Sequence, residues 1–165
     1  MNRRAVIAFT AFVTIVIAAN WATSQLGLVT WLGLTATAGT WLAGFAFVAR
    51  DYLQEDGGKR WVVAAILIGA AISALFSPAL ALASGVAFLV SEFADFAVYT
   101  PLRDSGRTRA AIASNVVGAV VDTVLFLWIA GFPLSGTATQ VLVKVGTTTV
   151  FVLAVRALSP KAVAA

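Results

Sequence analysis

WVVAAILIGAAISALFSPALALASGVAFLVS, residues 61–91, carries no charged side chain, and the first charge after it is Glu92. A helix needs about 20 apolar residues to cross the hydrocarbon core of a bilayer. This stretch is too long for one crossing, so the chain must turn within it. Ser77–Pro78 is the expected break, because proline disfavours helical geometry at the residue before it. The stretch therefore predicts two consecutive transmembrane helices.

The rest of the chain has the same character. Of its 165 residues, 61% are hydrophobic and 11% are charged, and the mean hydropathy is +0.97. A soluble domain usually carries about 25% charged residues. We predict an all-α fold, a single domain over residues 1–165 that forms a polytopic bundle of six transmembrane helices. The expected spans are residues 5–21, 32–49, 61–76, 78–99, 110–131 and 137–158.

The basic residues outside the spans predict the topology. They lie before the first span, between the second and third, between the fourth and fifth, and after or at the end of the sixth. The members of this set are Arg3, Arg4, Arg50, Lys59, Arg60, Arg103, Arg107, Arg109, Arg156 and Lys161. The other three connections have no Lys or Arg, so the positive-inside rule predicts a multi-pass protein of the cytoplasmic membrane with both termini in the cytoplasm. The net charge of +4 is thus a topology signal and does not indicate nucleic-acid binding.

The absence of two residue types limits the chemistry. The chain has no Cys and no His, which removes disulfides, the usual zinc and haem ligands, and Ser-His or Cys-His catalytic pairs. We therefore expect no enzymatic activity, no metal and no cofactor. The sequence G-x-x-x-x-G-K-[ST] is also absent, so an ATP site of that kind is not expected.

Four charged residues fall well inside the expected spans, away from their ends: Glu92, Asp95, Asp122 and Lys144. Each costs about 2.5–3.5 kcal/mol at the centre of a bilayer, so such groups face the bundle interior and pair. With a rise of about 1.5 Å per residue, Asp122 and Lys144 lie at similar depth on the last two spans. We predict an ion pair between them, which serves either helix packing or ligand binding.

Glu92 has no evident cationic partner at its depth, and we expect it to meet Asn115 on the adjacent helix. Asn115 could equally be a hydrogen-bonding contact between helices. Asp95 lies closer to the cytoplasm, within reach of Arg109 or of the loop that contains Arg103. It either pairs with one of these arginines or takes part in binding.

These groups suggest a ligand class. A carboxylate accepts two donors side by side, and an amide both donates and accepts. Tyr99, seven residues after Glu92 on the same helix face, or Trp41, which falls within the second span, could stack on a ring. Such a set suits a planar, purine-like base with several N–H groups.

Four segments in order resemble a known family. They are SEFADFAVY (residues 91–99), RAAIASN (109–115), DTVLF (122–126) and QVLVK (140–144). As an ordered set they resemble the queuosine precursor transporter family, also called the vitamin uptake transporter-like (VUT) family. The last segment adds Gln140 and Lys144 to the residues of interest.

The resemblance implies a six-helix importer of 7-deazaguanines, such as the nitrile and aminomethyl precursors of queuosine. It implies a fold akin to the substrate-binding S subunits of energy-coupling-factor transporters. The implied binding residues are Glu92, Asp95, Asn115, Asp122 and Lys144. Two alternatives stay open: a vitamin-binding S subunit, and a structural or pore-forming membrane protein. The expected partners are the lipid bilayer and a small nucleobase-like substrate, with an ATPase module or further copies of the chain also open.

Overall fold

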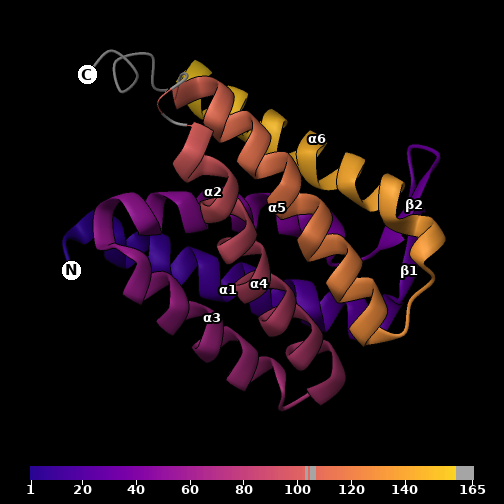
Figure 1. Cartoon of the computed structure of the whole chain (residues 1–165). Helices are drawn as coiled ribbons and strands as arrows, with labels where there is room; N and C mark the ends of the chain where they lie inside the picture. The colour runs from indigo at the N-terminus through magenta and orange to yellow at the C-terminus, as the bar shows by residue number, and fades with distance from the viewer. Residues whose placement is uncertain (103, 105–106, 159–165) are drawn as a thin grey trace.

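The computed structural model describes residues 1–102, 104 and 107–158, and it is almost entirely helical (Figure 1). The six α-helices are α1 (Arg3–Leu26), α2 (Thr40–Gly57), α3 (Lys59–Ser73), α4 (Pro78–Leu102), α5 (Arg107–Ala130) and α6 (Thr137–Leu158). A short 3-10 helix, η2 (Leu134–Gly136), precedes α6. The predicted all-α class and the six helices are confirmed.

The expected break between the third and fourth spans is also confirmed. Helix α3 ends at Ser73 and α4 begins at Pro78. A proline fits the first turn of a helix because its missing N–H would have no partner there. Pro101 lies one residue before the end of α4, whereas Pro160 falls outside the described residues.

The second expected span begins at Leu32, and this boundary is wrong. Residues Leu28–Trp31 form strand β1 and Leu34–Thr37 form strand β2, which pair as an antiparallel hairpin with Trp31 opposite Leu34. The two turn residues, Leu32 and Gly33, both have positive φ angles of 53° and 76°. That geometry matches the twist of a two-residue hairpin, and Gly33 supplies it without steric cost. Helix α2 therefore begins only at Thr40.

Four of the helices are long and apolar enough to cross a membrane by length and composition: Arg3–Leu26, Pro78–Leu102, Ala113–Ala130 and Leu134–Ala154, the last including η2. Helix α3 has 15 residues, which corresponds to about 22 Å of helix. Helix α2 ends in the charged sequence Arg50–Asp51, Glu55 and Asp56. Spans at α2 and α3 therefore stay a prediction.

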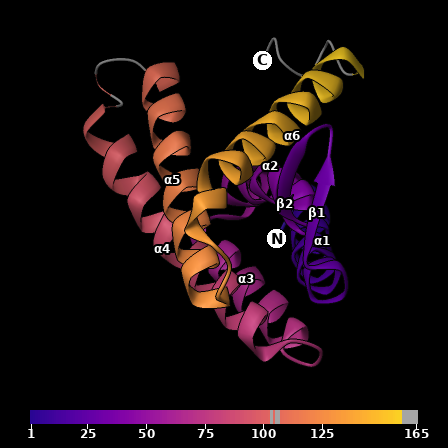
Figure 2. The same ribbon diagram turned by 90° about the vertical axis from the view of Figure 1, so that its right-hand side faces the viewer.

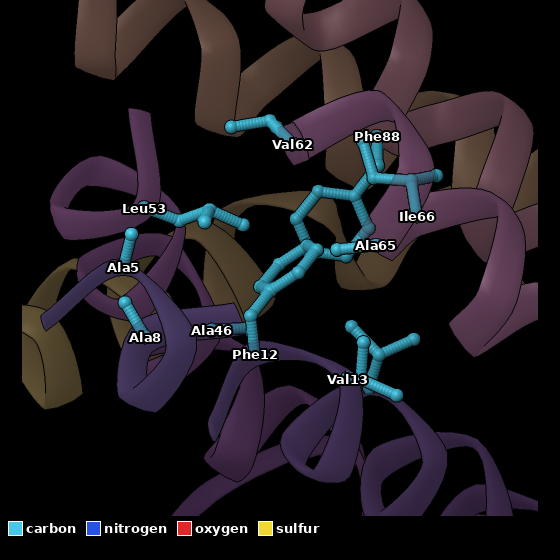
Figure 3. Close-up of a cluster of buried hydrophobic side chains, with 11 residues drawn as sticks. Ala5, Ala8, Phe12, Val13, Ala46, Leu53, Val62, Ala65, Ile66 and Phe88 are labelled. Carbon is cyan, nitrogen blue, oxygen red and sulfur yellow. The ribbon is translucent and has the colours of Figure 1, made fainter. Parts of the chain in front are cut away.

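The apolar core lies where α1 packs on α2, α3 and α4 (Figure 3). Phe12 of α1 is fully buried there, and its ring meets Phe88 of α4 edge to face with centroids 5.5 Å apart. Phe47 of α2 also contacts Phe88, with ring centroids 5.6 Å apart. Such aromatic pairs add about 0.5–1.5 kcal/mol beyond their buried area. The core thus fixes α2 against α4.

Helices α4 and α5 run side by side along most of their length, whereas α6 leans away from α5 and lies on α2 (Figure 2). The α2–α3 junction, the end of α4, the start of α5 and the end of α6 gather on one side of the molecule (Figure 1). The hairpin and the α5–α6 connection lie on the opposite side. This arrangement leaves polar side chains of α2, α4, α5 and α6 facing a common interior.

Candidate functional site

The predicted ion pair between α5 and α6 is confirmed. Lys144 Nζ lies 2.5 Å from Asp122 Oδ2 and donates a second hydrogen bond to Thr123 Oγ1 at 2.9 Å. Lys144 is 3% exposed and Asp122 4%. Thr123 in turn donates to the carbonyl oxygen of Ala119 at 2.7 Å. The buried ammonium is therefore compensated by one carboxylate and one hydroxyl.

Glu92 has a cationic partner that the sequence analysis does not find. Arg50 Nη1 of α2 lies 2.6 Å from Glu92 Oε1 of α4. Arg50 also lies 3.2 Å, through Nε, from Oδ1 of its neighbour Asp51. The sequence pattern places Arg50 in a cytoplasmic loop because it directly follows the expected span. It is instead 5% exposed, because α2 continues to Gly57 and directs this position toward α4.

Glu92 and Asn115 do not meet as expected. Among the described residues no hydrogen bond joins them, and Glu92 is held by Arg50. Asn115 lines a cavity, and Glu92 is not part of its wall. The partner of Glu92 lies on α2, so the sequence motifs of α4 and α5 could not predict this contact.

Asp95, one turn after Glu92, has a buried carboxylate oxygen, Oδ1, without a hydrogen-bond partner in the described part of the chain. From the sequence, Arg103 or Arg109 is expected to approach it. Arg103 lies outside the described residues, and so does the side chain of Arg109. Asp95 packs next to Gly118 of α5, where a methyl group on the glycine would lie 3.6 Å from Asp95 Cβ. The small glycine brings α5 close to α4 at this point.

A cavity of about 290 Å³ lies between α2, α4, α5 and α6. Its wall includes cationic, acidic, amide and hydroxyl groups alongside apolar surface. Its charged and amide lining residues are Arg50, Asp51, Asp95, Asn115 and Lys144. They lie toward the α2–α3 junction and the α4–α5 connection, in the half of the bundle with the basic connections.

A second, smaller cavity of about 40 Å³ is lined by residues of α1, α2, α4, α5 and α6. Asp122 and Lys144 belong to its wall, together with Asn20, Thr40 and Ser84. Lys144 lines both cavities. Lys144 is thus a side chain that the walls of the two cavities share.

Three other predicted binding residues lie elsewhere. Gln140 accepts hydrogen bonds from Thr40 at 2.6 Å and Thr37 at 3.3 Å, which ties α6 to the hairpin and to α2. Trp41 packs against Trp31 with ring centroids 4.9 Å apart, in the first turn of α2. Neither these two nor Tyr99 lines either of the two cavities, and their role in binding stays a prediction.

A model of a protein family described as "Putative vitamin uptake transporter" matches residues 72–159. This match covers more than half of the chain. The chain belongs to the vitamin uptake transporter family. Searches of curated proteins and of solved structures found no match. Family membership and the four long apolar helices make the chain a membrane protein.

The match contains all of α4, α5 and α6, and so it includes three walls of the larger cavity. The fourth wall, with Arg50 and Asp51 of α2, precedes the matched residues. In this vitamin uptake transporter the counter-charge of Glu92 therefore comes from outside the matched region. The sequence contains a signal for this buried position of Arg50. Arg50 comes directly after an apolar run, so a helix that continues by one residue keeps its side chain within the bundle.

Proposed function

We propose that the protein imports a 7-deazaguanine precursor of queuosine across the cytoplasmic membrane. Family membership supports uptake of a small molecule by a membrane protein. The observation that carries the finer proposal is the polar wall of the larger cavity, where a carboxylate and an amide, Asp95 and Asn115, lie on neighbouring helices. An amide both donates and accepts hydrogen bonds, which suits the ring edge of a deazaguanine, and a carboxylate accepts from N–H donors elsewhere on the ligand.

The size of the cavity supports a small ligand. Ligand pockets usually span about 300–1,000 Å³, and the cavity of about 290 Å³ lies at the lower limit. Its position supports an inward-facing state, because it lies in the half of the bundle that we assign to the cytoplasm from the basic connections. Under this assignment both termini are cytoplasmic, and the hairpin faces the outside.

Uptake of labelled 7-deazaguanine into a bacterial strain that cannot synthesise queuosine precursors tests the proposal. Expression of the chain should restore accumulation of the label and queuosine in tRNA. Asn115→Ala should reduce uptake, because it removes a donor and an acceptor from the cavity wall. Val117→Ala is the matched control, since Val117 is an exposed neighbour that lines neither cavity. Normal membrane expression without any uptake would refute the proposal.

A second candidate is a substrate-binding subunit that needs a separate ATPase module, and the family description of vitamin uptake favours it. Affinity purification from native membranes separates the two. Recovery of ATPase subunits, with uptake that stops when those subunits are deleted, would favour the second candidate. Uptake by the chain alone in reconstituted vesicles would favour the first.

A further inference from the structure

The charges at the larger cavity do not balance. Among the described residues, two cations line it, Arg50 and Lys144. Arg50 is in contact with Glu92 and Asp51, and Lys144 is in contact with Asp122. Each cation therefore already has a carboxylate partner before any ligand enters.

Four carboxylates stand at or next to the cavity, and Asp95 is the one that contacts neither of these two cations. It lines the cavity, and its Oδ1 is buried with no hydrogen-bond partner among the residues that the structure describes. Its nearest acidic neighbour on the same helix, Glu92, is three residues away and is held by Arg50. A buried acceptor without a donor is costly, and a charged one more so. The cavity thus offers a site for a positive charge with N–H donors.

We propose that Asp95 makes the cavity selective for a ligand that carries an ammonium group. This inference rests on the proposed function and narrows it: the aminomethyl 7-deazaguanine is preferred over the nitrile. An ammonium group has three donors and no acceptor, so it can satisfy Asp95 directly. The nitrile nitrogen is an acceptor, and next to a carboxylate it would leave Asp95 without a partner.

Binding of the two compounds to purified protein in detergent at pH 7 tests the proposal. The wild type should bind the aminomethyl form about tenfold more tightly than the nitrile, the ratio expected from one well-placed charge contact. Asp95→Asn keeps the shape of the side chain and removes its charge. It should bring the ratio close to one by weakening only the aminomethyl compound. Asp95→Glu keeps the charge and should retain part of the preference.

Glu55→Gln is the matched control. It removes one negative charge from an exposed position on α2 that is not part of the cavity wall, and it should leave the ratio unchanged. Equal affinities in the wild type, or a preference that survives in Asp95→Asn, would overturn the selectivity while leaving import of a deazaguanine intact. If Asp95→Asn does not fold, the ratio of the two affinities in the wild type still tests the selectivity. Failure of both compounds to bind would overturn the proposed function together with the selectivity.

Discussion

The Asp122–Lys144 pair offers the sharpest test of what the buried charges do. Both side chains are almost fully buried, and Lys144 has only Asp122 and Thr123 as hydrogen-bond partners in the described chain. Removing one member of a buried pair leaves an uncompensated charge, which costs about 3–5 kcal/mol. We expect Asp122→Asn and Lys144→Gln each to lower the free energy of unfolding by that amount.

The double variant should behave differently. With both changes, two neutral amides replace the pair, and they can hydrogen-bond to each other. No charge is then left uncompensated, so the loss should fall to about 1–2 kcal/mol, the size of a rearranged hydrogen bond. A double-mutant cycle isolates this coupling, because the difference between the double variant and the sum of the singles belongs to the pair.

Reversible unfolding in mixed detergent micelles, followed by tryptophan fluorescence, measures these energies. Lys59→Met is the control: Lys59 is exposed and lies over the Phe96 ring at 3.6 Å, so its loss should cost about 0.5–1 kcal/mol. The result that refutes the reasoning is additivity, with the double variant losing as much as both singles together. Uptake then separates the two roles of the pair: a stable double variant that transports normally makes the pair a packing element, and a stable one without uptake places it in the transport site.

Three further predictions concern contacts between helices. Gly44→Ala should lower the free energy of unfolding by about 1–3 kcal/mol, because a methyl group there would lie 2.7 Å from a carbonyl oxygen of α6. Gly146→Ala is the control: a methyl group there has no neighbour within 4 Å, so this variant should be more stable by about 0.5–1 kcal/mol in the same unfolding assay. Arg50→Met should abolish stable membrane expression, and adding Glu92→Gln should restore it, as quantitative immunoblotting would show; no rescue would mean that the Arg50–Glu92 contact is not what α2 needs. Gln140→Leu should lower the free energy of unfolding by about 1–3 kcal/mol, since the buried hydroxyls of Thr37 and Thr40 lose their shared acceptor and keep only the contact with each other. A loss of uptake at unchanged stability would contradict this structural role.

The hydrophobic pattern predicts the helices well because lipid leaves the backbone few choices. In a bilayer every backbone N–H and C=O must be satisfied within the segment, which favours helices over the whole apolar run. The turn at Ser77–Pro78 follows from the same constraint. The hairpin at Leu28–Thr37 escapes the prediction because its residues are as apolar as a span. Gly27, Gly33 and Gly39 are the local signal, since glycines at this spacing interrupt a helix and permit the turn.

The ion pair between Asp122 and Lys144 is predictable because both residues lie on consecutive antiparallel helices at equal depth. The partner of Glu92 is not, because the contact between α2 and α4 joins residues that are 42 positions apart in the chain. The rise per residue gives the depth of a side chain along its own helix, but it does not show which helices are neighbours. That choice depends on the packing of Phe12, Phe47 and Phe88, which brings α2 against α4.

The position of Arg50 changes what its own charge can do. A cationic side chain in a cytoplasmic loop would only orient the protein in the membrane. Buried between α2 and α4, the same guanidinium neutralises Glu92. It leaves Asp95, one turn further along α4, as an acid of the cavity wall with one oxygen that has no hydrogen-bond partner among the described residues. The aromatic packing that sets α2 against α4 therefore also decides which carboxylate Arg50 neutralises.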